Sequence, residues 1–231
     1  MLNIEHINQF YGESHTLWDL DLQVVEGKCT CLMGRNGVGK TTLLQCVMGL
    51  LPIRSGEIQF EGQSLNRQIA ERRAPLGIGY VPQGRQIFPM LTVEENLRIG
   101  LPARKEKSHQ IPEFIFELFP VLKEMLGRRG GDLSGGQQQQ LAIGRALVID
   151  PKLLILDEPT EGIQPNIVQE IGDIILRLNR DIGLTVLLVE QKLPFARKVA
   201  DHFCILDRGR NVSAGAMGDL GDDLIKQYLT V

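Results

Sequence analysis

One glycine-rich segment constrains this chain more than any other. Residues 34–41 have the sequence Gly-Arg-Asn-Gly-Val-Gly-Lys-Thr, which matches a glycine, four residues of any type, and then Gly-Lys-Ser/Thr. Glycine lets the backbone wrap closely, so that N–H groups point at phosphate oxygens. The positive end of a following helix faces the same anion. An apolar run, Lys28 to Met33, precedes the segment. It therefore predicts a phosphate-binding loop between a strand and a helix.

The residues of this loop have distinct expected roles. Lys40 supplies a positive charge to the outer phosphates, and the Thr41 hydroxyl is placed to ligate Mg²⁺. Such a loop does not name a function by itself, because kinases, GTPases, motors and transporters share it. The nucleotide-binding residues expected here are Gly34, Arg35, Asn36, Gly37, Val38, Gly39, Lys40, Thr41 and Thr42.

Size and charge exclude several other classes of protein. The chain has 231 residues, enough for a sizeable core, and a formal net charge of −3 without a basic block. We therefore expect no nucleic-acid partner. No apolar run approaches the ~18 residues that span a bilayer. Residues 1–11 have no basic segment before an apolar stretch, so we expect no secretory signal and a protein in the cytosol unless a partner holds it at a membrane.

The cysteines and histidines show no spacing that is typical of a metal site. Cys29 and Cys31 are two positions apart on an expected strand, so both point to one face. We expect reduced, buried thiols, which is the common state of free cysteine. The four histidines are expected to be solvated or structural.

Strand-like runs occur at both ends of the chain and indicate an α/β fold. The first sixty residues alternate such runs with turns, whereas the last hundred have a βαβ pattern with runs that are apolar on both faces, as in a parallel sheet. An amphipathic helix is expected over residues 166–178. The expected strands are Leu2–Ile7, Leu20–Val25, Lys28–Met33, Gly56–Phe60, Leu153–Leu156, Leu184–Val189, and a hairpin of Phe203–Leu206 with Asn211–Ala214.

The middle of the chain has a helical pattern. Thr92 and Glu95 have the spacing of a capping box, so a helix should follow through Ile99. Pro112 to Leu126 is a second helical stretch, interrupted at Pro120. We therefore expect one domain, residues 1–231, with a helical subdomain at about 84–131 inserted in the core.

A second motif lies about a hundred residues after the loop, where Leu133 is followed by Ser-Gly-Gly-Gln. This is the signature of the ATP-binding-cassette (ABC) family, which the chain resembles over essentially its whole length. A serine and two glycines at a helix start leave N–H donors free for an anion. The resemblance implies an ABC ATPase core with an N-terminal antiparallel β subdomain and a helical subdomain. It also implies that Ser134, Gly135, Gly136 and Gln137 face the γ-phosphate held by a second subunit, with two ATP molecules between them.

The apolar run from Leu153 ends in two carboxylates, Asp157 and Glu158, and resembles the Walker B strand. Ligands of α/β proteins bind at such strand ends. Asp157 can hold Mg²⁺ directly or through water. Neighbouring strand residues face opposite ways, so the two carboxylates should have different tasks. The resemblance assigns Glu158 as the base that activates the attacking water.

Two further residues match family positions. Gln83 resembles the Q-loop glutamine, which touches Mg²⁺ and the attacking water and lies where the β-rich part gives way to the helical part. Tyr11 resembles the aromatic residue that stacks on adenine, although a lone tyrosine could equally belong to the core.

The chain also departs from the family at two positions. Gln164 replaces the usual carboxylate of the D-loop, and Gln191 replaces the usual switch histidine. A glutamine amide can still donate a hydrogen bond to a γ-phosphate, but it carries no charge. The rate at which the subunit alone hydrolyses ATP therefore stays open.

Longer strings indicate one branch of the family. Glu190-Gln191 and the string from Glu158 to Pro165 resemble the second ATPase subunit of branched-chain amino-acid-type importers, and residues 81–85 and 127–140 most resemble the ATPase of the urea importer. The resemblance implies a second ABC ATPase, two membrane permeases and an external solute-binding protein as partners. It places the chain peripherally at the cytoplasmic face of the inner membrane. Urea is the expected cargo, with branched-chain amino acids as the alternative.

Two rival functions stay open. A non-transport ABC ATPase of DNA repair would carry long coiled-coil insertions, and one of translation usually joins two cassettes, whereas this chain has neither. A cassette that binds ATP without hydrolysis is opposed by intact Lys40, Asp157 and Glu158, but Gln191 keeps it open.

Overall fold

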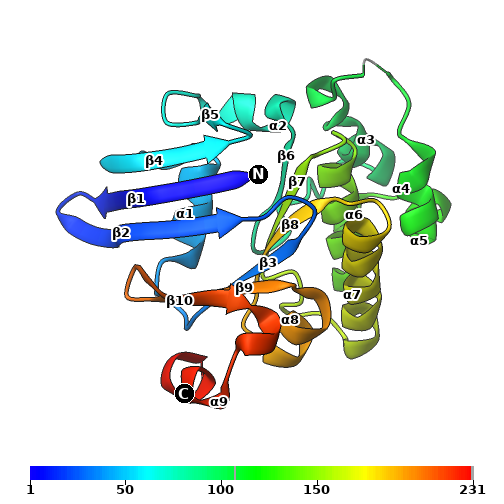
Figure 1. Ribbon diagram of the computed structural model, residues 1–231. Coiled ribbons are helices and arrows are strands. Elements are labelled where there is room, and N and C mark those ends of the chain that lie inside the picture. The colour runs from blue at the N-terminus through cyan, green and yellow to red at the C-terminus, as the bar shows by residue number, and fades with distance from the viewer. Residues whose placement is uncertain (107, 230–231) are drawn as a thin grey trace.

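The computed structural model describes residues 1–106 and 108–229, whose strands form two sheets (Figure 1). The smaller sheet is antiparallel, in the order β2-β1-β4-β5, and the larger sheet has the order β10-β9-β3-β8-β7-β6. The strands are β1 Leu2–Tyr11, β2 Ser14–Val24, β3 Cys29–Met33, β4 Ser55–Phe60, β5 Gln63–Ser64, β6 Ile78–Val81, β7 Leu153–Asp157, β8 Thr185–Val189, β9 His202–Asp207 and β10 Arg210–Ala216.

The helices connect and cover the strands of the larger sheet. They are α1 Lys40–Val47, α2 Arg73–Leu76, α3 Val93–Arg98, α4 Glu113–Leu118, α5 Pro120–Glu124, α6 Gly135–Leu147, α7 Pro165–Arg180, α8 Leu193–Val199 and α9 Asp222–Leu224. Short turns of other helical types occupy Ala70–Arg72, Leu101–Ala103, Gly130–Asp132, Met217–Asp219 and Ile225–Leu229. None of the helices in the described ranges is long and apolar enough to cross a membrane.

The smaller sheet follows from the alternation of buried and exposed residues along its strands. Its first two strands are longer than predicted. In β1, the apolar residues Leu2 and Ile4 are buried and alternate with partly exposed ones. A bulge then places His6 at φ 51° and shifts the register between Ile4 and Ile7. Because the alternation restarts after this bulge, the predicted strand at residues 2–7 continues to Tyr11, and its partner begins at Ser14 instead of Leu20.

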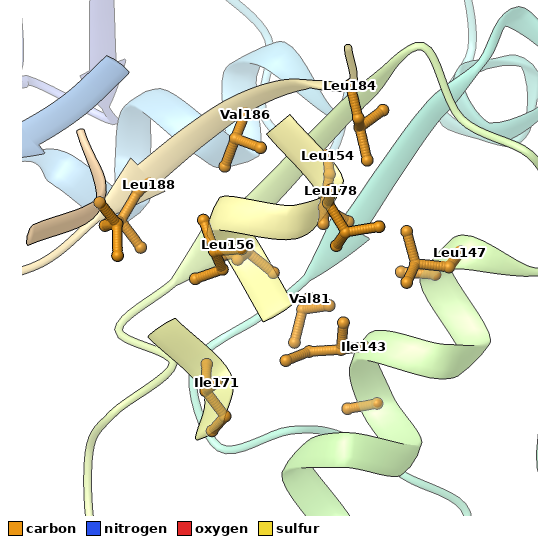
Figure 2. Close-up of a cluster of buried hydrophobic side chains, with 14 of the residues drawn as sticks. Val81, Ile143, Leu147, Leu154, Leu156, Ile171, Leu178, Leu184, Val186 and Leu188 are labelled. Atoms are coloured by element: carbon orange, nitrogen blue, oxygen red, sulfur yellow. The ribbon is translucent and has the colours of Figure 1, made fainter. Parts of the chain in front are cut away.

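The larger sheet is buried on both faces, as its apolar strands predict. Strands β9, β3, β8, β7 and β6 are parallel, and β10 adds an antiparallel edge to β9. Every residue of β3, β7 and β8 is buried. One face packs on α6 and α7, where Leu154, Leu156, Val186 and Leu188 meet Ile143, Leu147, Ile171 and Leu178 (Figure 2). The other face packs on α1 and on the smaller sheet.

The cysteines lie where their strand pattern predicts. Cys29 and Cys31 belong to the cluster on the α6 and α7 side, so they share one face of β3. Cys46 and Cys204 belong to the opposite cluster, and all four are free, buried thiols. No group of three or more His, Cys, Asp or Glu residues within 1–106 and 108–229 could hold a metal ion.

Short helices occupy the middle of the chain, and sheet β2-β1-β4-β5 lies on the opposite side of the molecule (Figure 1). The capping box of Thr92 and Glu95 is present, although α3 ends at Arg98, one residue before the predicted Ile99. Phe119, at φ −132° and ψ 72°, separates α4 from the helix that begins at Pro120, so the predicted interruption is confirmed. The limits 84–131 of a separate helical subdomain remain a prediction.

Candidate functional site

The glycine-rich loop links β3 to α1 and lies against two other strands. Gly34, Gly37 and Gly39 have φ values of 144°, 79° and 107°, a region that side-chain-bearing residues rarely adopt. A Cβ atom on Gly34 would lie 2.3 Å from the carbonyl oxygen of Leu206 in β9, and one on Gly39 would lie 2.8 Å from Leu17 in β2. The loop can therefore take this path only with glycine at these positions.

Lys40 begins α1, and its side chain turns back into the loop. The Nζ atom donates to the carbonyl oxygens of Gly34 at 2.8 Å and Arg35 at 2.9 Å and lies 3.8 Å from Oε1 of Glu158. Burial lowers the pKa of this ammonium group, and the nearby carboxylates of Glu158 and Asp157 oppose that shift. The loop thus encloses a positive charge that an anion can reach.

Asp157 ends β7 beside the start of α1. Its Oδ2 atom accepts a hydrogen bond from the Thr41 hydroxyl at 3.3 Å, whereas its buried Oδ1 atom has no hydrogen-bond partner among the described residues. Burial, more than any other cause, raises the pKa of this carboxyl group to about 6, and Glu158 adds to the shift. Hydroxyl and carboxylate oxygens are ligands that Mg²⁺ prefers. An unpaired buried carboxylate oxygen beside a threonine hydroxyl therefore fits such a cation.

Glu158 leaves the strand in a different direction from Asp157. Its φ is 49°, and its Oε1 atom accepts a hydrogen bond from Nε2 of Gln191 at 2.6 Å. The same Nε2 atom is 2.6 Å from Oδ1 of Asn36 in the glycine-rich loop. The two adjacent carboxylates thus have different partners, and Gln191 joins Glu158 to the loop.

Two recesses lie on either side of Glu158. The first has a volume of about 340 Å³, and the second, about 330 Å³, continues past the turn that follows β7. The first recess is lined by Thr16, Asn36, Gly37, Gly39, Lys40, Thr41, Thr42, Gln83, Glu158 and Glu161. The second is lined by Asn36, Glu158, Thr160, Glu161, Glu190, Gln191 and Lys192. Glu158 therefore has access to the phosphate-binding loop and to a second space.

Gln83 follows β6 and reaches the first recess, but its hydrogen bond was not expected. Its Nε2 atom donates to Oε2 of Glu161 at 2.9 Å. Sequence reasoning did not name Glu161 as a site residue. The signal that could have found it is a third carboxylate within the turn that carries Asp157 and Glu158.

Tyr11 stands at the end of β1 beside the start of α1. Its hydroxyl is 3.4 Å from both Oγ1 of Thr42 and Oε1 of Gln45. The residue is 48% exposed, so its ring is not a core side chain. A flat, exposed ring beside the phosphate-binding loop is available for stacking on a base.

The signature residues lie apart from this loop. Ser134 caps α6 and exchanges capping-box hydrogen bonds with Gln137, at 3.3 Å and 2.9 Å. A Cβ atom on Gly135 would meet Arg85 at 3.1 Å, and one on Gly136 would meet Ile167 at 2.9 Å. Among the residues that line the two recesses, none belongs to 134–137. The α6 N-terminus is thus a separate surface of the same chain.

A phosphate-binding loop between β3 and α1, with Asp157 and Glu158 at the end of another strand of the same parallel sheet, defines a P-loop nucleoside triphosphatase. The family model described as ABC transporter matches residues 17–161, more than half of the chain. The chain therefore belongs to the ABC transporter family, and it is an ATPase of that family.

Individual relatives agree with this assignment over nearly the whole chain. The high-affinity branched-chain amino acid transport ATP-binding protein BraG of Pseudomonas aeruginosa is 42% identical, covering 97% of this chain and 95% of the relative. The probable branched-chain amino acid transport ATP-binding protein LivF of Archaeoglobus fulgidus is 38% identical, covering 95% and 94%. A dimeric structure of a bacterial ABC transporter cassette superposes with a TM-score of 0.84 at 25% identity, covering 94% and 99%.

Proposed function

We propose that this chain is the ATP-hydrolysing subunit of a solute importer and that its cargo is urea. The observation that carries the ATPase role is that Lys40 and Glu158 line one recess, 3.8 Å apart, while Asp157 accepts a hydrogen bond from Thr41 of the same lining. The urea assignment rests on the strings at residues 81–85 and 127–140. The relatives named for branched-chain amino acid transport favour the second candidate cargo.

The nucleotide site follows from the geometry of the loop. The N–H groups of residues 34–42 and the Lys40 ammonium bind the phosphates, and the Tyr11 ring stacks on adenine. Thr41, Asp157 and Gln83 would hold Mg²⁺, and the unpaired Oδ1 of Asp157 beside the Thr41 hydroxyl supports this for the first two. When bound, the cation neutralises charge on the outer phosphates.

The reaction uses the side chains of Glu158, in the turn after β7, and of Gln191, at the switch position after β8. Glu158 accepts a proton from a water molecule whose oxygen attacks the γ-phosphorus, and the bond to the bridging oxygen breaks to release ADP. The Gln191 amide, 2.6 Å from Glu158 and from Asn36, orients the γ-phosphate and the base. Gln83, which lines the same recess, contacts the attacking water.

The complete site requires a second subunit. Ser134, Gly135, Gly136 and Gln137 lie at the start of α6 and line neither recess of their own chain, which supports a role in binding the γ-phosphate on a partner cassette. A dimeric structure of a bacterial ABC transporter cassette with the same fold supports this arrangement. We propose a non-identical partner, because Gln164 and Gln191 resemble the partnered subunit type.

The membrane partners are two permeases, to which an external binding protein delivers cargo. The segment that follows Gln83 exposes Phe88 by 45% and Met90 by 71%, and Ile99, directly after α3, is 44% exposed. Exposed apolar side chains of this kind mark interaction surfaces. We propose that the helical region at about 84–131 docks on the permeases at the cytoplasmic face of the inner membrane.

Uptake by cells that lack this subunit tests the cargo. Loss of labelled urea uptake with leucine uptake spared supports the urea assignment, and the reverse pattern moves the chain to the amino-acid branch. Loss of neither leaves the ATPase activity without the proposed transport role. If the wild-type gene restores uptake and the Glu158→Gln gene does not, the uptake depends on ATP hydrolysis.

A further inference from the structure

The two residues beyond Gln83 and Gly84 have an unusual backbone. Arg85 and Gln86 have φ values of 68° and 45°, and neither is glycine. Left-handed backbone is unfavourable for residues with side chains unless other contacts hold it. The side chain of Arg85 and the two carbonyl groups make such contacts, and all of them reach α6, the helix that begins with the signature glycines.

The Arg85 side chain contacts the first two turns of α6. Its Nη1 atom donates to Oε1 of Gln138 at 3.2 Å. The Nε2 atom of Gln138 donates in turn to the carbonyl oxygens of Gly130 and Leu133, both at 3.2 Å, so the amide is fixed with its oxygen toward Arg85. An oriented acceptor thus holds the guanidinium group in place.

The same guanidinium group packs on two glycines. A Cβ atom on Gly135 would lie 3.1 Å from Nη1 and 3.2 Å from Nη2 of Arg85, and one on Gly162 would lie 3.7 Å from Nη2. Gly135 is the first residue of α6, and Gly162 belongs to the turn that follows Glu158 and Glu161. Arg85 therefore lies against the first glycine of α6 and close to the turn after the base.

A second arginine attaches the backbone of this segment near the other end of α6. The Nη2 atom of Arg145 is 2.8 Å from the carbonyl oxygen of Gln86 and 3.4 Å from that of Arg85. Its guanidinium carbon lies 5.2 Å from the centre of the Phe88 ring. The segment 85–88 is thus fixed to α6 at two places.

We propose that Arg85 is a positioning residue that couples Gln83 in one ATP site to the signature residues that complete the other site. This inference rests on the proposed dimer. Gln83 faces the phosphates of its own chain, whereas Gly135 faces those of the partner. Because Arg85 joins the Gln83 segment to the signature, nucleotide bound at one site aligns the signature that completes the second site. The two ATP sites are therefore linked by a coupling free energy.

The test compares Arg85→Met, Arg85→Lys, Gln138→Leu and the double variant Arg85→Met/Gln138→Leu. Arg180→Met, at an exposed arginine at the end of α7, is the matched control. ATP affinity of the full chain is measured by calorimetry, and folding by thermal melting. ATP-driven association is measured in the Glu158→Gln background, with the partner cassette, by light scattering. The Hill coefficient for ATP is measured on the assembled complex.

We expect Arg85→Met to keep ATP affinity within about two-fold, to weaken ATP-driven association at least ten-fold, and to lower the Hill coefficient toward one. Arg85→Lys keeps the charge but loses the contacts of the planar guanidinium group, so association and the Hill coefficient should fall as in Arg85→Met. It replaces Arg85→Met as the test if the methionine variant folds poorly. The double variant should be no worse than Arg85→Met, because both changes break one contact.

Two negative results have different meanings. Wild-type association and Hill coefficient in both Arg85 variants would overturn this inference alone. Failure of the chain with Arg85 intact to associate on ATP, while it still binds nucleotide, would overturn the proposed dimer and this inference with it.

Discussion

The hydroxyl of Thr160 donates a hydrogen bond to Oε2 of Glu190 at 2.8 Å, and both residues are buried. The other oxygen of this carboxylate accepts the backbone N–H groups of Gln191 at 2.8 Å and Lys192 at 2.9 Å. A buried carboxylate whose two oxygens both accept hydrogen bonds is costly to disturb. It ties the turn after Glu158 to the segment that carries the switch residue.

Thr160→Val should lower both stability and turnover. The change leaves Oε2 of Glu190 without its donor, and an unsatisfied buried group costs about 1–3 kcal/mol. Thermal melting and steady-state hydrolysis measure the two effects, while ATP affinity should change little. Thr160→Ser keeps the hydroxyl and is the matched control. Equal melting temperatures for valine and threonine would show that this hydrogen bond contributes nothing.

Glu158→Gln should retain ATP binding and stall hydrolysis, because an amide cannot accept the proton of the attacking water. The stalled protein should accumulate as an ATP-bound dimer, detected by size-exclusion chromatography with light scattering. Turnover at the wild-type rate without accumulation of the dimer would assign the base to another residue.

Gln191→Ala should slow turnover more than it weakens ATP binding. The Gln191 amide joins Glu158 to Asn36 and carries no charge, so its contribution is orientation. Gln191→His should be tolerated, because an imidazole can also donate a hydrogen bond. Hydrolysis by the assembled complex is the measurement, and an unchanged rate in Gln191→Ala would contradict the proposed role.

Asp157→Asn should stabilise the nucleotide-free protein at pH 7.5. Burial raises the pKa of Asp157 to about 6 from its ordinary 3.8, so the folded state binds this proton more tightly than the unfolded state. The resulting stability is present below pH 4 and lost as the pH rises through 6. The asparagine variant should therefore gain on the order of 3 kcal/mol at pH 7.5.

Chemical unfolding in EDTA between pH 4.5 and 7.5 measures this difference, which should narrow at the acidic end. In the same variant, Mg²⁺ should no longer add to the stabilisation that ATP gives. A stability difference that does not change with pH would show that the Asp157 carboxyl group is not responsible.

Lys40→Ala should lose most of the ATP affinity of the chain. Charge-assisted hydrogen bonds to phosphate contribute about 1.5–3 kcal/mol each. Lys28→Ala, at a half-exposed lysine before β3, is the control for loss of one positive charge. Unchanged nucleotide affinity by calorimetry in Lys40→Ala would refute the role of the loop.

Secondary structure could be predicted from the sequence wherever a local residue pattern determines it. Apolar runs predicted the doubly covered strands β7 and β8, and the capping box predicted at Thr92 is present. The short helices α2 and α8 were not predicted, because four and seven residues carry too little periodicity.

Contacts between distant segments were beyond sequence reasoning. The bond from Gln83 to Glu161 spans 78 positions, and that from Arg85 to Gln138 spans 53. No local pattern specifies such pairs, since they depend on how β6, β7 and α6 are brought together. The identity of the cargo could not be predicted from residues of the ATP site, because in the proposed importer the solute contacts only the permeases and the binding protein.

The buried thiols make this chain convenient for chemical labelling. Only a thiolate reacts readily with maleimides, and burial raises the pKa of Cys29, Cys46 and Cys204 to about 12. Burial also raises the pKa of Cys31 well above its usual range. A cysteine introduced at an exposed position, such as Arg180→Cys, should therefore take a fluorophore selectively while the native thiols stay unmodified. Distances across an assembled transporter could then be followed by energy transfer in the otherwise unaltered sequence.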